Sequence, residues 1–507
     1  MCRRALCRIS THGTIAGSDA CLYFRFMDSK RKTLFIALAA LLAIMAFVVW
    51  LMRGDTANQP MDKVTGKDPL LEEEFDTQTI PTVAIAETVG WGKGQAPKSV
   101  QGLSVTRFAE GLDHPRTMLS LPNGDVIVAL TNSPPRNGPG GITGFVMNYF
   151  LDKAGAGAPS PNKLVLLRDA DGDGRAEQRF VLKEGLDSPS GLALGDGRLY
   201  VSNHDALLSF PYQTGQTRLS GEPEKLMDLP AGGDHWMRNI VLSPDGKHIY
   251  IAVGSATNIA DNGMEAEQGR AMIWEYDIKT GGRRPFALGL RNPTGMAWNP
   301  LTEELWTTVN ERDLLGSDLV PDYLTNVPVG AHYGWPWVYW RKIEDVRVKW
   351  AMPEFLTEYA RKPEYALGPH VAALGLVFAD EGHRMGGAFG NGAFVARHGS
   401  WNRKPYSGYD VVFIRFDERG NPAGKPLPVL TGFLTGDGDT HGRPTWLAWD
   451  KGGALLVSDD TAGIIWRVID PKAEPGKKMV LPKYESLPPQ KELKGDPSDA
   501  FKQGFKF

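Results

Sequence analysis

A short pattern recurs six times along this chain: an apolar stretch, a turn rich in Pro, Asn, Asp or Gly, and a second apolar stretch. The instances are LSLPNGDVIVAL (119–130), LALGDGRLYVSN (192–203), VLSPDGKHIYIAVG (241–254), MAWNPLTEELWTTVN (296–310), GAFGNGAFVARHG (387–399) and LAWDKGGALLVSDD (447–460). Residues with high β propensity on both sides of a tight turn are typical of β-hairpins. Amphipathic helices do not alternate with these hairpins, which argues against strand–helix–strand units.

The number and spacing of the hairpins predict the fold. Six units in about 370 residues give roughly 60 residues per unit, a little more than a usual propeller blade. We therefore predict an all-β, six-bladed β-propeller over residues 101–470, with a two-sheet sandwich as the alternative. The wide gap between residues 310 and 387 indicates an insertion. In a propeller the inner strands surround a central funnel, where residues distant in the sequence can meet.

An uncharged apolar segment, TLFIALAALLAIMAFVVWLM (33–52), precedes the hairpins. As a helix it would be about 30 Å long, enough to cross a bilayer. Lys30, Arg31 and Lys32 come directly before it, and such basic residues favour the cytoplasmic side. We therefore expect one transmembrane signal anchor in the inner membrane, with residues 1–32 cytoplasmic and the body periplasmic. A cleaved signal peptide is the alternative.

The other segments carry no regular pattern. Residues 53–100 are polar and contain Pro and Gly, as expected for a linker, and residues 471–507 are rich in Lys and Pro, as expected for a loosely ordered tail. The three cysteines all precede residue 33, so the predicted body contains no disulfide. The net charge is −3 and no basic run stands out, so nucleic acid is not an expected partner.

The stretch DHWMRN (234–239) comes directly before the third hairpin, at a position expected near the funnel. A histidine with an adjacent carboxylate, as in His235 next to Asp234, is suited to act as a general base. The alternative is a hydrogen-bonded surface histidine without a catalytic role.

Other polar residues also stand at hairpin boundaries. Four arginines from separate units are expected to converge on an anionic ligand, such as a polycarboxylate or a phosphate: Arg291, Arg397, Arg403 and Arg443. The loop TVNERDLLGSDLVPDYLT (308–325) is rich in carboxylates and amides, which suit a hard cation such as calcium.

A second acidic run, RDADGDGRAE (168–177), places Asp169, Asp171 and Asp173 at the spacing of a calcium-binding loop. Phe180 stands where an EF-hand has its bidentate Glu. We therefore expect a partial, structural calcium site here, with a tight Asp/Gly turn as the alternative.

The motifs, taken in order, resemble one family. DH before a strand, LGLRNPTGMAW, an acidic loop ending in YGWP, HGSWNR, and GRP followed by SDD are similar to motifs of the pyrroloquinoline quinone (PQQ)-dependent glucose/sorbosone dehydrogenases, and most similar to the L-sorbosone dehydrogenase branch. The resemblance covers about residues 100 to 470. It implies a six-bladed propeller that holds PQQ in its funnel, with a calcium ion bridging cofactor and protein.

The resemblance also implies roles for individual residues. His235 would remove the proton from the sugar hydroxyl, with Asp234 beside it, while Arg291 and Asn292 would contact PQQ and the reacting oxygen. Arg443 would bind a carboxylate of PQQ, and Asp460 would pair with basic groups of the site. Arg403 or Lys404 would take the place of the family's cofactor-binding lysine. Main-chain or amide oxygens would bind calcium, from Asn310, Glu311 and Arg312.

Two positions depart from the glucose-oxidising members of the family, at cofactor contacts: Thr294 replaces Gln, and His441 stands with Arg443 where those members have two arginines. Glucose is therefore not the expected substrate. We predict a quinoprotein oxidoreductase that transfers hydride from a hydroxyl or hydrated aldehyde of an aldose- or sorbosone-type sugar to PQQ, and passes electrons to a membrane quinone or periplasmic carrier. The alternatives are a calcium-dependent, lactonase-like hydrolase and a non-enzymatic binding propeller. Four converging arginines argue against the hydrolase, because a neutral lactone needs no such set.

Overall fold

The structure, a computed structural model, describes residues 29–51, 54–72, 77–78, 82–100, 102–135, 153, 155 and 157–481. The chain divides into two compact units, Met1–Gly54 and Asp55–Phe507.

The first unit contains helix α2 (Ser29–Leu51), which is apolar from Leu34 onwards. Leu34, Ile36 and Leu41 each expose more than half of their surface. Within the described part of the chain, no helix is long and apolar enough to cross a membrane, and the predicted anchor remains a prediction. Most of the segment predicted to be cytoplasmic, residues 1–32, lies outside the described residues.

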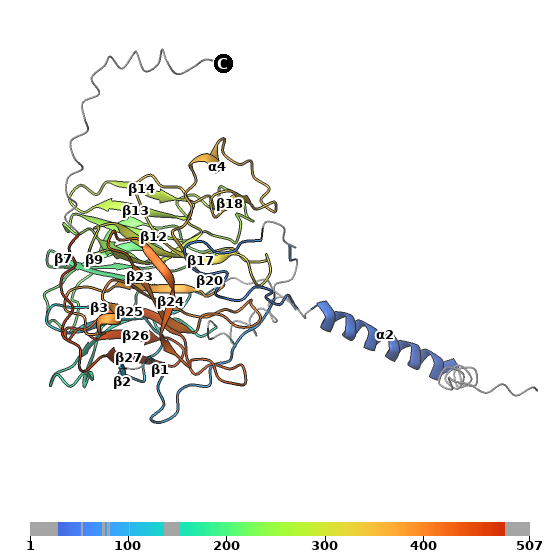
Figure 1. The fold of residues 1–507 in the computed structure, drawn as a ribbon, viewed down its shortest axis with the longest axis horizontal. Coiled ribbons are helices and arrows are strands. Elements are labelled where there is room, and N and C mark those ends of the chain that lie inside the picture. The colour runs from blue at the N-terminus through green and yellow to red at the C-terminus, as the bar shows by residue number, and fades with distance from the viewer. Residues whose placement is uncertain are drawn as a thin grey trace, which may run out of the picture. The chain divides into compact units, whose positions relative to one another are not determined.

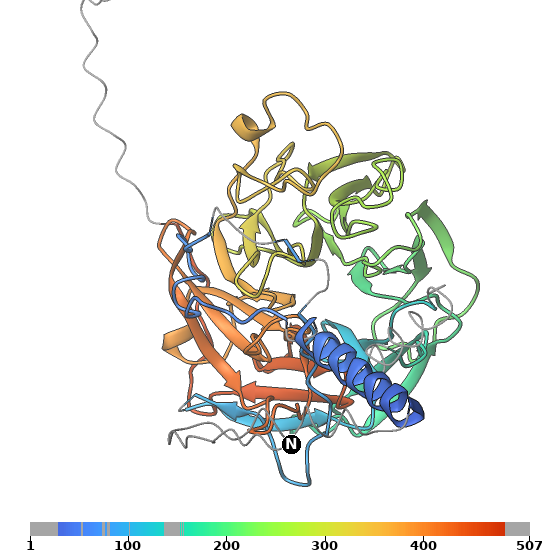
Figure 2. The ribbon, with the colours of Figure 1, turned by 90° about the vertical axis from the view of Figure 1, so that its right-hand side faces the viewer.

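Antiparallel sheets arranged in a ring build the second unit (Figure 1 and Figure 2). Blade 1 consists of β3 (Pro115–Ser120), β4 (Val126–Leu130), β5 (Lys163–Arg168) and β6 (Gln178–Lys183). Blade 2 consists of β7 (Gly191–Gly195), β8 (Arg198–Ser202), β9 (Ala206–Pro211) and β10 (Glu224–Asp228). Blade 3 consists of β11 (Ile240–Leu242), β12 (His248–Val253), β13 (Met272–Asp277) and β14 (Arg283–Leu288).

The second half of the ring follows the same plan. Blade 4 consists of β15 (Asn292–Trp298), β16 (Leu305–Asn310), β17 (Pro321–Asn326) and β20 (Tyr365–Pro369). Blade 5 consists of β21 (Ala373–Phe378), β22 (Gly392–Arg397), β23 (Asp410–Phe416), β24 (Pro422–Thr431) and the short β1 (Lys98–Ser99). Blade 6 consists of β25 (Pro444–Trp449), β26 (Leu455–Asp459), β27 (Ile464–Ile469) and β2 (Ser104–Ala109).

Strand β2 closes the ring. It precedes blade 1 in the sequence but pairs with β27, so that Ser104 and Ile469 from the two ends of the propeller are register partners. Closure of this kind joins the first and last parts of the propeller sequence and protects strand edges from pairing with other chains. The prediction of an all-β, six-bladed propeller is confirmed.

Five of the six predicted hairpins form the first two strands of a blade. The exception is residues 387–399, which supply β22 alone, because a 3-10 turn, η1 (Gly387–Phe389), occupies the first half of that stretch. The first strand of blade 5 is β21, which lies further upstream. The predicted insertion lies between β17 and β20 and contains β18 (Val338–Tyr339), β19 (Ile343–Glu344) and helix α4 (Leu356–Tyr359).

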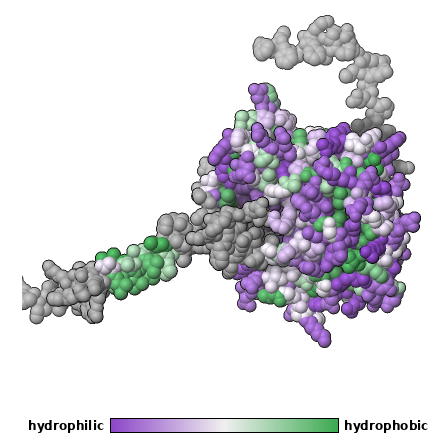
Figure 3. All heavy atoms as spheres, turned by 180° about the vertical axis from the view of Figure 1, so that it is seen from behind, coloured by the Kyte–Doolittle hydropathy of each residue, from purple (hydrophilic) through white to green (hydrophobic). Residues whose placement is uncertain are grey.

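Each pair of neighbouring blades encloses a separate apolar cluster. In β4, Val126 and Val128 pack towards blade 6, whereas Ile127 and Ala129 pack towards blade 2. Successive side chains point to opposite faces of a strand, so a blade between two others needs apolar residues at every position. Burying each such side chain contributes about 1.5–3 kcal/mol. On the face shown in Figure 3, hydrophilic residues cover most of the second unit.

The described residues of the segment predicted as a linker, 53–100, differ from a free tether because they contact the propeller at many points. Trp91 stacks on His441, with ring centroids 4.7 Å apart, and donates a hydrogen bond to Asp459 (2.9 Å). The main-chain N–H of Asn58 donates to Asp318 Oδ2 (2.6 Å). These contacts involve single residues without a sequence period, which explains why the sequence pattern does not reveal them.

Candidate active site

Two positions in every blade face the same end of the propeller: the start of the first strand and the end of the second. They lie side by side because these strands are antiparallel; in blade 4, Asn292 and Asn310 are register partners. A cavity of about 270 Å³ opens among such positions. It brings together seven of the residues singled out from the sequence: Asp234, His235, Arg291, Asn292, Thr294, Asn310 and Glu311.

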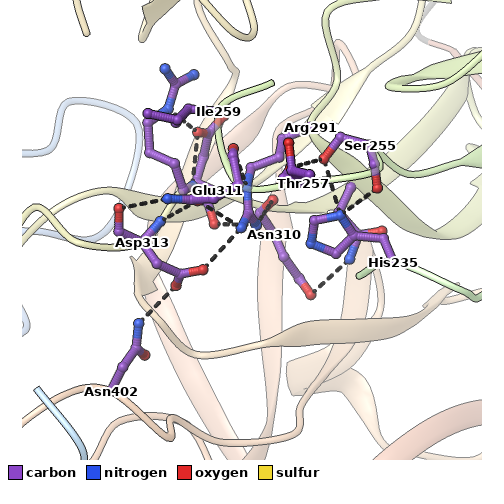
Figure 4. A network of polar contacts seen from close by, with 12 residues as sticks. His235, Ser255, Thr257, Ile259, Arg291, Asn310, Glu311, Asp313 and Asn402 are labelled. Carbon is purple, nitrogen blue, oxygen red and sulfur yellow. Dashed lines mark hydrogen bonds and ion pairs between the residues drawn. The ribbon is translucent and has the colours of Figure 1, made fainter. Parts of the chain in front are cut away.

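His235 lies just before β11 and is held through one ring nitrogen (Figure 4). Its Nδ1 lies 2.9 Å from the main-chain oxygen of Ser255 and 3.0 Å from Ser255 Oγ. The carbonyl oxygen only accepts, and Ser255 Oγ donates its own proton to the main-chain oxygen of Thr257 (2.7 Å), so Nδ1 carries the ring proton. Nε2 is therefore the unprotonated nitrogen, and it hydrogen-bonds to none of the described residues.

The environment keeps this imidazole neutral. Burial, reinforced by the positive charge of Arg291, lowers the pKa of His235 to about 3. The lone pair on Nε2 is therefore unprotonated throughout the physiological range, as a general base requires. An anion bound beside it would raise this pKa, because negative charge favours the imidazolium form.

Gly254 allows His235 and Asn292 to approach each other. It follows β12, and a Cβ atom at this position would lie 2.6 Å from His235 Cβ and would also meet Asn292 Oδ1. Asn292 Oδ1 is buried and has no hydrogen-bond partner among the described residues. A close backbone approach of this kind requires glycine.

Arg291 organises one wall of the cavity rather than presenting a free guanidinium (Figure 4). Nη1 donates to the main-chain oxygens of Glu311 (2.6 Å) and Asn310 (3.4 Å). Nη2 donates to Asn258 Oδ1 (2.9 Å) and Asp313 Oδ2 (2.9 Å), and Nε donates to the main-chain oxygen of Asn258 (3.1 Å). All five N–H donors of the side chain thus have protein acceptors.

Asp313 links this wall to blade 5. Its Oδ1 accepts a hydrogen bond from Asn402 Nδ2 (2.7 Å) and lies 3.6 Å from His370 Nδ1. Burial opposes its ionisation, but the charges of Arg291 and His370 outweigh that effect and lower the pKa of Asp313. The same ion pair outweighs burial at the imidazole and raises the pKa of His370.

Asp322 is a buried carboxyl between two main-chain donors. The N–H of Glu311 donates to its Oδ1 (2.8 Å) and the N–H of Ala372 donates to its Oδ2 (2.7 Å). Burial raises the pKa of Asp322 to about 7, despite these hydrogen bonds. Asp322 therefore fastens the loop after β16 to the residues before β21, both of which line the cavity.

The opposite wall is built by Arg116, at the start of β3, and His398, just after β22. Both contact Asp460, which follows β26: Arg116 Nη1 lies 2.5 Å from Oδ2, and His398 Nε2 lies 3.0 Å from Oδ1. Burial opposes ionisation of Asp460, but the charges of His398 and Arg116 outweigh it and lower its pKa. The Arg116 guanidinium also lies 5.5 Å from the ring centre of Trp236.

Two residues predicted to bind the cofactor, Arg403 and Lys404, line a separate cavity of about 510 Å³. Arg403 Nε donates to the main-chain oxygen of Ser317 (2.9 Å), and Nη2 lies 3.6 Å from Asp318 Oδ1. Both acceptors belong to the loop between β16 and β17, which draws the guanidinium away from the central cavity.

Arg443 and Arg397 also point elsewhere. The buried guanidinium of Arg443 donates to the main-chain oxygen of Ala86 (3.3 Å) and lies 5.1 Å from the ring centre of Tyr409. Arg397 pairs with both carboxylate oxygens of Asp410. The predicted convergence of four arginines is therefore wrong: of that set, Arg291 is the member that lines the cavity.

The oxygens expected to bind calcium are engaged by the protein. The main-chain oxygens of Asn310 and Glu311 accept hydrogen bonds from Arg291, as described above. Arg312 is wholly buried, and its guanidinium pairs with Glu311 and with Asp345 of the insertion. These residues therefore do not fit a calcium ion as they are arranged, because a cation could reach the two oxygens only if Arg291 released them.

The second predicted calcium site forms an exposed acidic cluster. Carboxylate oxygens of Asp169, Asp171, Asp173 and Glu177 lie within 4.8 Å of one another. Asp169 accepts hydrogen bonds from the main-chain N–H groups of Gly172 (2.7 Å) and Gly174 (2.8 Å), as in a tight turn. Calcium binding at this cluster remains a prediction.

Several lining residues received no role from the sequence, above all Arg116, His370 and His398, and Asp313 and Asp322 were noted only as carboxylates of the acidic loop 308–325. A positional rule identifies two of them: Arg116 begins the first strand of its blade and His398 follows the second. Asp322 lies inside β17 of blade 4, and its donors are the main-chain N–H groups of Glu311 in the same blade and of Ala372 before blade 5, a combination that no local pattern indicates.

The propeller is similar to a known protein family. A family model described as TrAA12-like matches residues 163–326 and 354–471, more than half of the chain. An uncharacterised protein of Borreliella burgdorferi is 26% identical over 300 residues, which cover 57% of this chain and 77% of that protein. A pyrroloquinoline quinone-dependent pyranose dehydrogenase of Coprinopsis cinerea is 33% identical over 138 residues, which cover 23% of this chain and only 18% of that protein.

Solved structures share the propeller fold. A structure of the Trichoderma reesei Carbohydrate-Active Enzymes Family AA12 matches with a TM-score of 0.60 and 19% identity, covering 74% of this chain and 98% of that one. The holo form of the pyranose dehydrogenase PQQ domain of Coprinopsis cinerea matches with a TM-score of 0.58 and 20% identity, covering 76% of this chain and 100% of that one.

Proposed function

Because the chain belongs to the TrAA12-like family, we propose that it is a PQQ-dependent sugar dehydrogenase. It would oxidise a CH–OH group or a hydrated aldehyde of a sugar and transfer the hydride to PQQ. The relative that is named a PQQ-dependent pyranose dehydrogenase supports this cofactor and this substrate class.

The observation that carries the proposal is the state of His235. Its proton is fixed on Nδ1 by Ser255, and its lone pair on Nε2 is left for the cavity. This is the arrangement that a general base needs in order to remove a hydroxyl proton.

The cavity also fits a polar, anionic cofactor. Arg116 Nε, Asn292 Oδ1 and Asn402 Oδ1 line it and are buried without a hydrogen-bond partner among the described residues. Leaving such atoms unpaired costs about 1–3 kcal/mol each, which a ligand with both acceptors and donors would recover. PQQ carries carboxylates and ring nitrogens of these kinds. Arg116, Asn292 and Asn402 are therefore the residues that would hold it.

PQQ, when bound, supplies the electrophilic quinone that accepts hydride. The chain's own residues supply orientation and proton transfer. His235 Nε2 would accept the hydroxyl proton as hydride leaves the carbon that bears the hydroxyl group, and negative charge from bound carboxylates would strengthen this base by raising its pKa. Arg291 keeps the loop with Asn310 and Glu311 in place, and Asp322 fastens the neighbouring blade.

Calcium has no assigned step in this proposal, because Arg291 occupies the oxygens of Asn310 and Glu311. An L-sorbosone-type sugar remains the proposed substrate on the basis of the motif resemblance. The proposed location is the outer face of the inner membrane, which the apolar sequence of residues 33–52 and the exposed Leu34 and Ile36 support. The proposed electron acceptor is a membrane quinone or a periplasmic carrier.

The test is reconstitution of the purified protein with PQQ, with and without added calcium, followed by dye reduction with aldoses and sorbosone. We expect stoichiometric PQQ binding and sugar-dependent reduction. His235→Gln should bind PQQ and lose turnover, whereas the control His248→Gln, which removes an imidazole near Asp277 (3.8 Å) outside the cavity, should behave like wild type. No PQQ binding and no dye reduction would leave the hydrolase and the binding propeller as the remaining functions.

A further inference from the structure

A second imidazole of the cavity, His398, is also held through one nitrogen. Its Nε2 lies 3.0 and 3.1 Å from the two carboxylate oxygens of Asp460. The main-chain N–H of His398 donates to the oxygen of Ala372 (3.0 Å), which fixes the backbone beside the cavity. Hydrogen bonds of the ring nitrogen Nε2 and of the main-chain N–H therefore orient the imidazole of His398.

The proton of this ring is placed by Asp460. Arg116 Nη1 lies 2.5 Å from Asp460 Oδ2, and the charges around this carboxyl keep it ionised. An ionised carboxylate only accepts hydrogen bonds, so His398 Nε2 donates and Nδ1 holds the lone pair. Nδ1 hydrogen-bonds to no residue in the part of the chain that the structure describes.

Three charged groups act on His398: Asp460 just after β26, Arg116 at the start of β3, and Arg443 just before β25. Burial lowers the pKa of His398, and the two arginines lower it further, against the opposing effect of Asp460. The ring is therefore neutral at neutral pH, with the lone pair on Nδ1 unprotonated. Of these three groups, Asp460 is the one that accepts the Nε2 proton and so leaves the lone pair on Nδ1.

The site thus contains two neutral, oriented imidazoles on different blades. His235 precedes the first strand of blade 3, and His398 follows the second strand of blade 5, with blade 4 between them. Oxidation of a sugar CH–OH group by a quinone removes two electrons and two protons. The hydride carries both electrons and one proton to the cofactor, and the hydroxyl proton goes to His235. Return of the cofactor to its oxidised form would then give two electrons to two equivalents of a one-electron acceptor and release the one proton that arrived with the hydride.

We infer that His398, oriented by Asp460, is a second catalytic base of this site and takes up a proton that the reduced cofactor releases when it is reoxidised. This inference rests on the proposed function. His398 Nδ1 would accept this one proton and pass it to solvent, while the two electrons would go to the acceptor. His235 serves sugar oxidation and His398 serves cofactor reoxidation.

The test separates the two half-reactions in PQQ-loaded wild type, His398→Gln and His235→Gln. The Gln amide at position 398 can still donate to Asp460 but has no basic nitrogen. Stopped-flow absorbance measures reduction by sugar without an acceptor, and then reoxidation by ferricyanide, which takes up electrons without protons. We expect His398→Gln to reduce within about twofold of wild type and to reoxidise at least about tenfold more slowly at pH 7, as expected for loss of general base catalysis.

Two further measurements do not depend on turnover. The PQQ dissociation constant of His398→Gln, from absorbance titration, should stay within about threefold of wild type. NMR of the cofactor-free wild type should show His398 protonated on Nε2 at neutral pH. His398→Ala provides a second variant, in which added imidazole should restore reoxidation. His248→Gln is again the matched control.

Equal reoxidation rates and pH profiles in wild type and His398→Gln would overturn the inference. The inference would also be overturned if His398→Gln raised the PQQ dissociation constant more than tenfold and slowed both half-reactions equally. His398 would then be a residue that binds the cofactor. Failure of the proposed function is seen separately, as a wild-type protein that does not bind PQQ or does not reduce it with sugar, and it overturns the inference as well.

Discussion

Gly254→Ala tests whether the position of His235 limits catalysis. The new Cβ would lie 2.6 Å from His235 Cβ, whereas non-bonded carbons pack at about 3.5–4.0 Å. His235 must therefore move by about 1 Å, and a misplacement of this size costs about 100-fold in rate. Overpacking of this kind lowers the free energy of unfolding by about 1–3 kcal/mol, so the variant should fold.

The assay is sugar-dependent dye reduction by PQQ-loaded protein, together with denaturant unfolding. Gly436→Ala is the control, because no atom lies within 4 Å of a Cβ at that position. We expect Gly254→Ala to lose about 100-fold in kcat while the control keeps wild-type kcat and stability. A Gly254→Ala variant with kcat within twofold of wild type would refute the reasoning that His235 must stay in place.

Other residues give further predictions. Ser255→Ala removes one of the two acceptors of the His235 Nδ1 proton, a hydrogen bond worth about 0.5–1.5 kcal/mol. It should lower kcat/KM by about 2- to 12-fold. An unchanged kcat/KM would contradict the assignment of the proton to Nδ1. Arg312→Met leaves the buried carboxylate of Glu311 without its cation, while Asp345 keeps Arg347. It should cost about 3–5 kcal/mol in denaturant unfolding, and a stability equal to that of wild type would contradict this. The pKa of Asp322 is about 7 in the folded protein and about 4 in the unfolded chain. As the pH rises from 4 to 7, the free energy of unfolding of wild type should therefore fall relative to that of Asp322→Asn. If the difference in unfolding free energy stayed constant over this range, burial would not be raising the pKa of Asp322. Treatment with EGTA should leave PQQ affinity within about threefold, because Arg291 holds the candidate calcium oxygens; a larger loss would mean that calcium displaces it.

The repeated hairpins made the fold predictable. Strands such as Val126–Leu130 are apolar at every position because neighbouring blades cover both faces, and turn residues separate them. The same regularity predicts which residues share the cavity: Asn292 and Asn310 occupy equivalent ends of antiparallel strands. The strand topology therefore places in one cavity residues that the sequence motifs mark only as candidates.

Side-chain direction could not be predicted in the same way. Arg443 stands at a hairpin boundary, yet its guanidinium turns to the main-chain oxygen of Ala86. Arg403 turns to Ser317 and Asp318. These acceptors belong to segments that are distant in the sequence and have no period, so the tertiary contacts that redirect both arginines leave no local signal.

The most direct test is an absorbance titration of the purified protein with PQQ, followed by sugar without an electron acceptor, in wild type and His235→Gln. The account predicts that both proteins bind one equivalent of PQQ and that sugar reduces it only in the wild type. A wild type that binds no PQQ, or a His235→Gln variant that is reduced as fast as wild type, would contradict it.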